Sequence, residues 1–395
     1  GGRAQVADQR AARAVWAEVD LEALAANVAL LARCAEPASL YAVVKADAYG
    51  HGAVPVARAA VGAGAAGLAV ALVAEGLELR AHGVTAPVLV LSEAPPDAAD
   101  DLVRAGLSAT VTTMQGLRTL AAAARRSATR ARLHVKVDTG MHRIGVAPGE
   151  TGELVRAAEA EPALVCEAVW THLAVADGAT EEDRAFTSHQ LETFDTVVDG
   201  LGARPRLLHA ANTAAAVGWP SARYDLVRCG IGMYGYAPSG AMADGSAGED
   251  VASVLAGLRP VLALKARVSE VRELETGARP SYGRRRPLPR RSVVATVPIG
   301  YADGVPRRLF DTGCPVLVGG RPRPLAGVVT MDQLMVDCGP GATVVPGDEV
   351  VLLGRQGAAT IDAADWAERL GTIAYEVLCG IGPRVPRVHV AGARE

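Results

Sequence analysis

The sequence predicts a (β/α)8 barrel followed by a mainly β C-terminal domain, and two observations support this fold class. Over roughly 220 residues, eight short apolar runs alternate with helical patterns, as expected for a barrel of parallel strands. Beyond residue 240 the pattern changes to valine-rich runs separated by Gly and Pro, which is typical of β structure. A doubly wound open sheet is the alternative for the first part, but the count of eight favours the barrel.

The barrel elements follow in order along the chain. A short strand at 16–20 ends in Asp20, a suitable N-cap for a helix over 21–34. The eight barrel strands are expected at 40–44, 67–71, 88–91, 108–111, 133–137, 166–171, 206–209 and 225–227. Helices between most of them are expected at 54–61, 73–81, 114–124, 152–160 and 183–201.

The second part of the chain begins after a stretch at 237–257 that is rich in Gly, Ala, Ser and Pro, which suits a domain boundary. One helix is expected at 362–370. Strands are expected at 261–271, 292–298, 315–318, 333–338, 349–353 and 387–390. We interpret this part as an antiparallel β domain.

Composition excludes several classes of function. A length of 395 residues suggests two domains, and a hydrophobic fraction of 50% with only 4% aromatics predicts an aliphatic core. The net charge of −3 comes without a basic face or an acidic tail. We therefore expect neither nucleic acid nor a membrane surface as a partner.

The cysteines and the apolar runs bear on the cellular compartment. The six cysteines lie far apart without a CxxC pair, so we predict neither a metal site nor a disulfide framework, and a reducing cytoplasm suits them. The first fifteen residues lack the apolar core of a signal peptide. The longest uncharged run, 59–74, is shorter than the ~18–20 residues that span a bilayer, and we interpret it as a helix end plus a buried strand.

The stretch from Ala42 to Gly52 contains the strongest chemical motif. An apolar run ends in Lys45, and a loop of small residues with Tyr49, Gly50 and His51 follows. Burial at a strand end disfavours the ammonium form, so this amine can attack an aldehyde and form a Schiff base, as in enzymes that use pyridoxal 5'-phosphate (PLP). The alternative is an ordinary surface lysine at the start of a loop.

Four more barrel strands end in polar residues, and strand ends of a barrel converge on one face. Taken singly, each has a structural explanation, such as a helix N-cap for Asn212 or a salt bridge for Arg228. Together they predict one site. The residues are Lys136 and Arg143 after the fifth strand, His172 after the sixth, Asn212 and Thr213 after the seventh, and Arg228, Gly230 and Ile231 after the eighth.

These residue types suit PLP chemistry. Backbone N–H groups of Gly230 and Ile231, with the Thr213 hydroxyl, can hold a phosphate. An arginine opposite the pyridine nitrogen could not accept a proton, so the ring would be a weaker electron sink and prompt reprotonation of Cα would be favoured. Racemisation needs bases on both faces of Cα, and Tyr282 in Ser-Tyr-Gly is the candidate partner of Lys45, although a structural tyrosine in a turn is the simpler interpretation.

Together these motifs resemble the bacterial alanine racemase family over almost the whole chain. The resemblance implies that Lys45 binds PLP, that Tyr282 is the second catalytic base, and that Lys136 is often carbamylated and orients Arg143 toward the cofactor phenolate and the substrate carboxylate. Residues implied to line the substrate entrance are Tyr301 and Met331. Further implied cofactor positions are Tyr49, His172, Asn212, Thr213, Arg228, Gly230, Ile231 and Tyr375.

The resemblance also implies an assembly and a domain division. Tyr282 is expected to reach the site from the partner subunit of a homodimer, and the substrate is a small amino acid, alanine. The N-terminal strand is expected to join the β domain, which gives a barrel over 18–250 and a β domain over 1–17 and 251–395. Departures from the usual pattern are Thr213, Cys229, Thr330 and the basic run at 284–286.

Three other functions remain open at this point. A broad-specificity amino-acid racemase is similar in kind. A PLP-dependent decarboxylase of basic amino acids shares the architecture, but a glutamate is expected where Arg228 stands. A non-enzymatic PLP-binding barrel is expected to lack the β domain, whereas about 140 residues follow the barrel here, more than one small domain needs.

Overall fold

A computed structural model of the chain describes residues 14–239, 242 and 248–392. The chain divides into two compact units, which we call the barrel unit, residues 23–48 and 52–259, and the β unit, residues 1–22, 49–51 and 260–395. Most of the N-terminal stretch judged to lack a signal peptide, and most of 240–247 in the expected boundary, lie outside the described residues.

The barrel unit contains an eight-stranded sheet in which all neighbours are parallel, in the order β8-β7-β6-β5-β4-β3-β2-β9. The strands are β2 Ser39–Val43, β3 Gly67–Val70, β4 Val88–Glu93, β5 Ser108–Val111, β6 Ala131–Lys136, β7 Leu164–Trp170, β8 Leu207–His209 and β9 Leu226–Cys229. The ends of β8 and β9 are joined by backbone hydrogen bonds from Asp225 to Leu208 and from Arg228 to Ala211. The sheet is therefore nearly closed, and the predicted barrel is confirmed.

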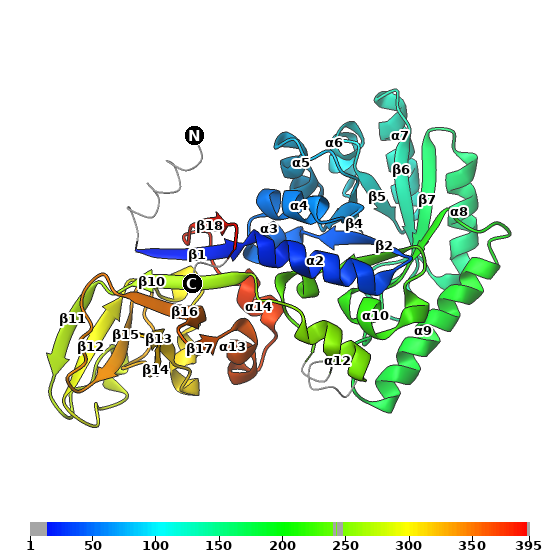
Figure 1. The fold of residues 1–395 in the computed structure, drawn as a ribbon. Helices are drawn as coiled ribbons and strands as arrows, with labels where there is room; N and C mark the ends of the chain where they lie inside the picture. Colours follow the sequence, from blue (N-terminus) through cyan, green and yellow to red (C-terminus); the bar gives the residue numbers. More distant parts are fainter. Residues whose placement is uncertain (1–13, 240–241, 243–247, 393–395) are drawn as a thin grey trace. The chain divides into compact units, whose positions relative to one another are not determined.

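Helices follow the strands and cover the sheet (Figure 1). They are α2 Leu21–Ala35, α4 Ala53–Gly62, α5 Val73–Ala81, α6 Ala99–Arg104, α7 Met114–Arg126, α8 Thr151–Ala160, α9 Glu181–Asp199, α10 Thr213–Gly218 and α12 Glu249–Ala256. In α7, buried Leu117, Leu120, Ala121 and Ala124 form one helix face, and Thr113 caps its N-terminus by accepting a hydrogen bond from Gly116 N. Burying one such leucine is worth about 1.5–3 kcal/mol, so this face holds the helix on the barrel.

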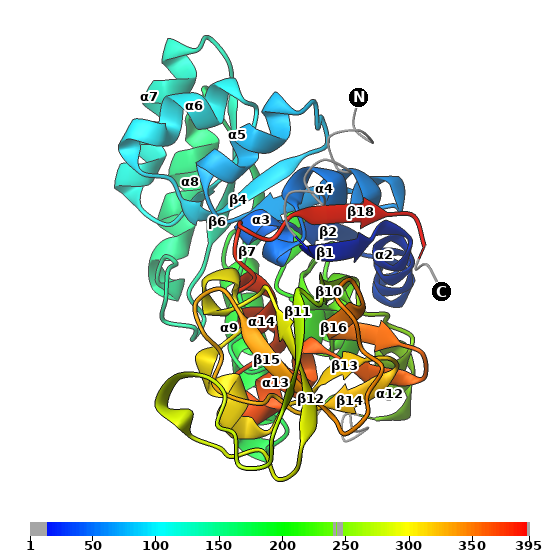
Figure 2. The same ribbon diagram turned by 90° about the vertical axis from the view of Figure 1, so that its left-hand side faces the viewer.

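The β unit contains two sheets (Figure 2). The larger has the order β14-β13-β16-β10-β1-β18 with β17 beside β16, and the smaller has the order β11-β12-β15. The strands are β1 Val15–Asp20, β10 Leu262–Arg267, β11 Glu270–Leu274, β12 Ser292–Val297, β13 Val316–Val318, β14 Arg321–Arg323, β15 Leu334–Gly339, β16 Glu349–Gln356, β17 Ala359–Ile361 and β18 Arg387–Val390. The N-terminal strand β1 pairs with β10 and β18, as expected.

Three predictions for the β unit were wrong in detail. The run 261–271 is two strands in two sheets, because the chain leaves β10 at Arg267 and enters β11 at Glu270. The unit is not purely antiparallel, since β1 and β18 are parallel. A second helix, α14 Ala374–Cys379, follows the expected one, α13 Ala363–Leu370.

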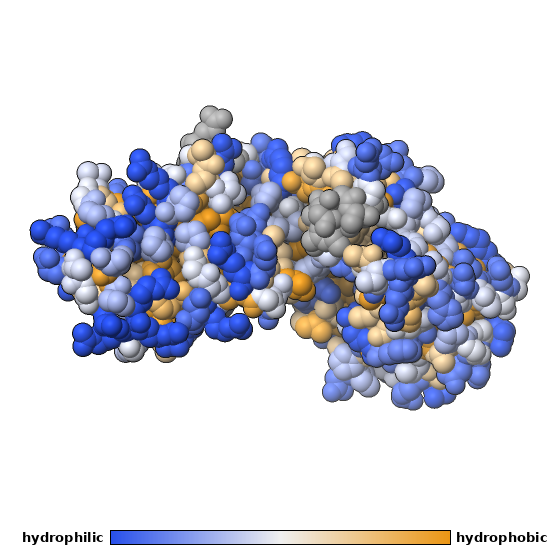
Figure 3. Space-filling model, turned by 90° about the horizontal axis from the view of Figure 1, so that it is seen from below, coloured by the Kyte–Doolittle hydropathy of each residue, from blue (hydrophilic) through white to orange (hydrophobic). Residues whose placement is uncertain are grey.

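Short single turns complete the description. They are α3 Lys45–Gly50 and the 3-10 turns η1 Pro96–Ala98, η2 Pro148–Glu150, η3 Pro220–Ala222, η4 Ile231–Tyr234, η5 Tyr282–Arg284, η6 Tyr301–Asp303 and η7 Arg307–Thr312. On the face drawn in Figure 3, hydrophilic residues predominate and apolar residues lie in patches between them. Within the described ranges, every helix is too short or too polar to cross a membrane.

Candidate active site

Lys45 begins a backbone turn of unusual hand. The expectation was a loop, but α3 is a left-handed turn in which Ala46, Asp47, Ala48 and Tyr49 all have φ between 52° and 55°. For L-residues this conformation costs about 1–2 kcal/mol per residue, so other contacts must hold it. Strained backbone of this kind is found at functional sites.

One carboxylate holds the start of this turn, and another joins the turn to the helix α4 that follows it. Glu75 Oε1 accepts a hydrogen bond from Ala46 N at 2.6 Å, and Asp47 Oδ1 accepts one from Ala53 N at 2.6 Å. Ala46 N at the start of the turn and Ala53 N at the start of α4 are both donors without a partner inside their own turn or helix. The direction in which the chain leaves Lys45 is therefore fixed by side chains from α5 and from the turn itself.

Lys136 ends β6 and is a buried cation. It is 2% exposed, and its Nζ lies 4.7 Å from the centre of the Trp170 ring. Burial above all, with the charges of Arg143, Arg228 and Lys45 and against an opposing effect of Asp138, lowers the pKa of Lys136 to about 7. A large fraction of this amine is neutral at pH 7, which makes it a nucleophile.

The loop after β6 brings Arg143 back to the end of the strand. Asp138 Oδ1 accepts hydrogen bonds from Gly140 N at 3.1 Å and His142 N at 3.0 Å. At Gly145, with φ of 149°, an added Cβ would lie 2.5 Å from Asp138 N, so only glycine allows the loop to close this tightly. Arg143 itself is exposed and its guanidinium forms no ion pair within the described residues.

Arg228 in β9 is held by acceptors from β7 and β8. Its NH1 donates to His209 Nδ1 at 2.6 Å, and its NH2 lies within hydrogen-bonding distance of three acceptors: Thr171 O at 3.0 Å, Ala210 O at 2.9 Å and His172 Nδ1 at 3.3 Å. The side chain is 3% exposed, and burial lowers its pKa to about 9, which still leaves it charged at neutral pH. No ion pair neutralises it in the described part of the chain.

His172 stands beside this cation as a neutral base. Burial holds its pKa well below the usual value, and the charges of Arg228, Lys136, Arg143 and Lys45 add to the effect. Because Arg228 can only donate, the His172 Nδ1 that faces it must be an acceptor. The electrostatic coupling also indicates that these candidate residues face one region.

The candidate phosphate residues also lie together in the barrel unit. Asn212 caps α10 by accepting a hydrogen bond from Ala215 N, and Thr213 Oγ1 accepts one from Gly230 N at 3.0 Å. The Gly230 N–H, expected to be offered to a phosphate, is therefore already used within the protein. Ile231 begins η4, where an N–H lacks an intrahelical partner, and Gly232 leaves room for the Thr213 methyl group, 2.7 Å from where its Cβ would lie.

Five candidate residues belong to the β unit, and four of them lie in two pairs. The rings of Tyr49 and Tyr375 lie 6.1 Å apart at 43°. Tyr301 N donates to Thr330 O, and Ala302 N donates to Met331 O, so Tyr301 and Met331 share one surface, where they are 42% and 53% exposed. The cofactor role of Tyr49 and Tyr375 and the entrance role of Tyr301 and Met331 stay predictions.

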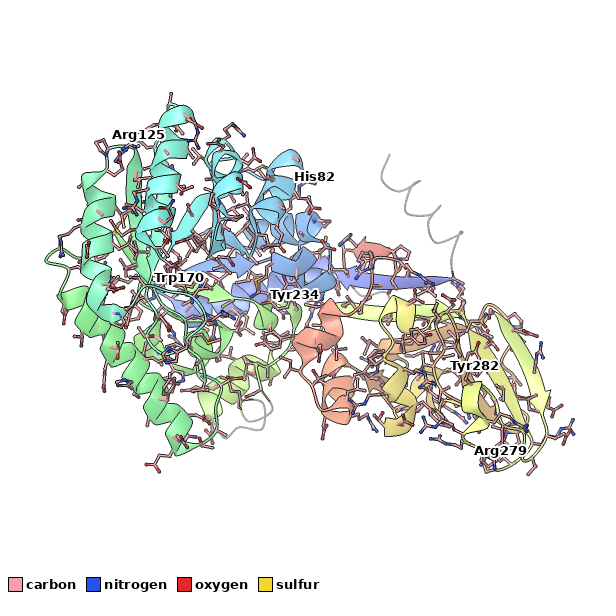
Figure 4. All side chains as sticks on the ribbon, turned by 180° about the vertical axis from the view of Figure 1, so that it is seen from behind. His82, Arg125, Trp170, Tyr234, Arg279 and Tyr282 are labelled. Carbon is pink, nitrogen blue, oxygen red and sulfur yellow. The ribbon has the colours of Figure 1, made fainter. Side chains whose placement is uncertain are left out.

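Tyr282, the fifth, is 72% exposed and stands on a rigid turn (Figure 4). Ser281 Oγ donates to Val328 O at 2.7 Å, and Arg279 NH1 donates to Arg284 O at 3.0 Å. Ser281 and Gly283 on either side of the tyrosine both have φ of 70°. The turn is therefore fixed while the phenol is presented to the outside.

Sequence reasoning missed two buried residues of the barrel unit, Trp170 and His134, and a partly buried one, Glu167. Trp170, labelled in Figure 4, stacks on His209 at 5.2 Å and lies 4.6 Å from the Arg228 guanidinium. His134 and Glu167 continue the polar network below His209. His134 stands two residues before Lys136 on the same face of its strand, and that spacing is a signal that could have found it.

In the described ranges, no group of three or more His, Cys, Asp or Glu residues is placed so that it could hold a metal ion. The family model for the N-terminal domain of alanine racemase matches residues 19–238, and the model for its C-terminal domain matches residues 261–389. These matches cover both units.

Curated proteins and solved structures agree with the family models. The chain is 45% identical over 380 residues to alanine racemase of Symbiobacterium thermophilum, covering 95% of this chain and 97% of that protein, and 42% identical over 384 residues to that of Thermobifida fusca, covering 96% and 98%. Among solved structures it is similar to alanine racemase from D-cycloserine-producing Streptomyces lavendulae, with a TM-score of 0.87 and 38% identity over 96% of this chain and 98% of that one. The enzyme from Streptomyces coelicolor gives a TM-score of 0.86 and 41% identity over 95% and 98%. The chain therefore belongs to the alanine racemase family.

Proposed function

We propose that this protein is a racemase that interconverts L- and D-alanine and uses PLP as its cofactor. The observation that supports it best is Arg228, a buried cation that can only donate and that no carboxylate neutralises in the described part of the chain. A decarboxylase of this architecture needs a carboxylate at this place, so that alternative is not favoured. The presence of a complete β unit disfavours a simple cofactor-binding barrel.

The residues of the barrel unit fit a cofactor that carries negative charge. Lys136 and Arg228 are buried without an ion pair among the described residues, and both lie against the Trp170 ring. Buried cations of this kind call for an anion, and PLP has a phosphate and a phenolate. The residues proposed to hold it are Lys45 through its amine, Arg143, His172 and Arg228 around the ring, and Tyr49, Asn212, Thr213, Gly230, Ile231 and Tyr375 near the phosphate.

When bound, PLP supplies an electron sink that makes the Cα–H bond of alanine acidic. Arg228 cannot accept a proton and so keeps the ring nitrogen unprotonated, which limits the electron withdrawal. His172, neutral because it is buried among cations, adds no further charge. Both residues therefore favour the return of a proton to Cα over side reactions.

Inversion requires that protons leave from one face of Cα and arrive at the other. We assign one face to Lys45 Nζ and the other to Tyr282 Oη. Arg143 is proposed to bind the substrate carboxylate, and Tyr301 with Met331 to line the entrance. These assignments give each of the predicted site residues a role at a stated atom or surface.

The second base is proposed to come from the partner subunit of a homodimer. Tyr282 is 72% exposed on a rigid turn, and Tyr301 and Met331 are also exposed, which is unusual for residues that act in a water-excluded site. A second copy of the chain would cover them. Within one chain we propose the domain bounds 18–250 and 1–17 with 251–395, and the cytoplasm remains the location predicted from the six free cysteines.

Lys136 is proposed to be carbamylated. Its neutral amine can add to CO2 with release of one proton to water, and the carbamate would carry a negative charge among Arg143, Arg228 and Lys45, whose cationic charges now lower the Lys136 pKa. A carbamate would also give Arg143 an acceptor. This modification converts an unfavourable buried cation into a counter-charge for its neighbours.

One assay tests the proposal. Purified protein is given PLP and then L-alanine, L-serine or L-lysine in D2O, and the enantiomers, deuterium at Cα and the cofactor absorbance are followed. We expect inversion with deuterium incorporation for alanine well above the other two. Comparable rates for all three would support the broad-specificity alternative, whereas CO2 release, or failure to bind PLP, would contradict the proposal.

A further inference from the structure

The polar network around Arg228 continues into the barrel interior through side chains to which the proposed mechanism gives no role. His209 Nε2 lies 3.0 Å from His134 Nδ1, and His134 Nε2 lies 3.7 Å from Glu167 Oε2. Both histidines are buried, at 0% and 1% exposure. Arg228, His209, His134 and Glu167 therefore form a continuous row from a cation to a carboxylate.

The direction of every proton in this row follows from Arg228. A guanidinium only donates, so His209 Nδ1 accepts and its proton must be on Nε2. That proton points at His134 Nδ1, which must accept in turn, so the His134 proton is on Nε2 and points at Glu167. At 3.7 Å the last contact is a long one, but it joins an N–H to a carboxylate and is electrostatically favourable.

A second proton on either imidazole would break this sequence of donors and acceptors. It would place two N–H groups face to face, either at Arg228 and His209 or at His209 and His134. Burial lowers the pKa of both histidines and the charge of Arg228 lowers each further, whereas Glu167 acts in the opposite direction on His134. The row thus has one stable protonation pattern, with a full positive charge at one end, a full negative charge at the other and two neutral rings between.

The position of Glu167 depends on a local irregularity of β7. Cys166 pairs with Leu133 and Ala168 pairs with His134, so Glu167 is an extra residue in the strand. In a regular strand, residues 167 and 170 would point to opposite faces. The irregularity lets Glu167 reach His134 although Trp170, three residues later, contacts His209.

The outer side of Glu167 is neutralised separately. Its Oε1 lies 3.8 Å from Arg132 Nε and 3.7 Å from Arg206 NH1, whose side chains are 60% and 74% exposed. Its Oε2 faces inward and is 3.4 Å from Ser108 Oγ, which donates to it. The carboxylate is 13% exposed, so it is the point where the buried row meets charges near solvent.

We propose that His134 and Glu167 are positioning residues. Acting through His209, they hold the Arg228 side chain in one position and in its charged form. Glu167 faces the His134 Nε2 proton at the end of the row, and the two neutral imidazoles keep His209 Nδ1 an acceptor for Arg228. The contacts within this chain are sufficient evidence for the row of side chains. Its effect on racemisation rests on the proposed function, since Arg228 matters there as the partner of the ring nitrogen.

The direct test is the tautomer of each imidazole, measured by 15N NMR of the full-length protein with 15N-labelled histidine. We expect both His134 and His209 to be neutral with the proton on Nε2 from pH 6 to pH 9, assigned with His134→Gln. A proton on Nδ1 of either ring, or an imidazolium within this range, would overturn the proposal. The measurement needs no catalytic activity, so it is independent of the proposed function.

Substitution tests the transmission. In Glu167→Gln the 15N shifts of His209 should change although the two residues are not in contact, whereas Arg132→Gln, which alters only the outer side of Glu167, should leave them unchanged. With alanine as substrate, we expect Glu167→Gln to lower kcat by about tenfold with KM within about twofold, as is usual for residues that orient a site from behind. Equal His209 shifts in both variants would refute the relay, and the wild-type tautomers decide the matter should Glu167→Gln fail to fold.

Discussion

The barrel unit and the β unit present their candidate residues in opposite ways. In the barrel unit, Lys136 and Arg228 are 2% and 3% exposed and are held by neighbouring side chains at fixed distances. In the β unit, Tyr282 is 72% exposed and only its backbone turn is held. The barrel unit thus holds its cations by contacts within one chain, whereas the proposed second base of the β unit is left exposed. In the two-copy site proposed above, burial is therefore a poor guide to which residue matters most.

Replacing Tyr282 by phenylalanine is the sharpest way to break this comparison. If the most exposed candidate is the second base, Tyr282→Phe should lower alanine racemisation by about 10²–10⁴-fold, because proton transfer at one face is lost. PLP should still bind, and one enantiomer of alanine should still exchange its Cα proton with solvent through Lys45. Tyr301→Phe is the control on the same unit and should cost far less. A Tyr282→Phe enzyme with near-normal turnover would remove the phenol from the mechanism.

Mixing two inactive variants tests whether the exposed residue completes a site on another copy. Lys45→Ala and Tyr282→Phe chains, unfolded together and refolded, should form mixed dimers in which one of the two sites has both bases. Random pairing then predicts recovery of about a quarter of the wild-type activity. Each variant refolded alone is the control. No recovery in a preparation proven to contain mixed dimers would mean that both bases come from one chain.

The parts of the fold that sequence could predict are those in which local pattern and tertiary structure agree. The strand expected at 108–111 is β5 Ser108–Val111, because four buried residues there are bounded by residues that do not continue the pattern. The run 261–271 was assigned to one strand because neither Gly nor Pro marks the change of sheet near Ser269. Local signals suffice for a strand but not for the sheet to which it belongs.

The site shows the same limit. Polar residues at strand ends were found because parallel strands converge, and this holds whatever the details of each strand. Glu167 was missed because an irregularity in β7 changes the face of the sheet toward which its side chain points. The regular alternation of side chains between the two faces of a strand is the only guide that sequence offers. The left-handed turn after Lys45 was missed because Ala46 and Asp47 have no strong preference for it, and the contact from Glu75, distant in sequence, holds it.

Lys136, a buried lysine of the barrel unit, gives a smaller effect that depends on pH. The pKa of Lys136 is lowered from 10.5 in the unfolded chain to about 7, so between these pH values the unfolded chain holds a proton that the folded chain has released. The free energy of unfolding should therefore rise with pH in this window, by at most about 1.4 kcal/mol per pH unit for one proton. Urea unfolding of CO2-free protein at pH 7 and pH 9 measures this rise. It should be absent in Lys136→Met and kept in Lys265→Met, which removes an ammonium paired with Glu18 at 2.8 Å. An equal rise in wild type and Lys136→Met would locate the effect elsewhere.

The smallest expected effect concerns the backbone strain of the left-handed turn that follows Lys45. Ala46 is exposed and has φ of 53°, a conformation that costs an alanine about 1 kcal/mol more than a glycine, whereas glycine loses about as much in chain entropy. Ala46→Gly should therefore change the free energy of unfolding by only a few tenths of a kcal/mol. The matched control, exposed Ala185 in the right-handed helix α9, should lose about 1 kcal/mol on the same substitution, since nothing there relieves the entropy cost. Urea unfolding of both variants compares them directly. Equal losses at the two positions would show that the turn after Lys45 is not left-handed in solution, and the fixed exit of the chain from that lysine would then lose its structural basis.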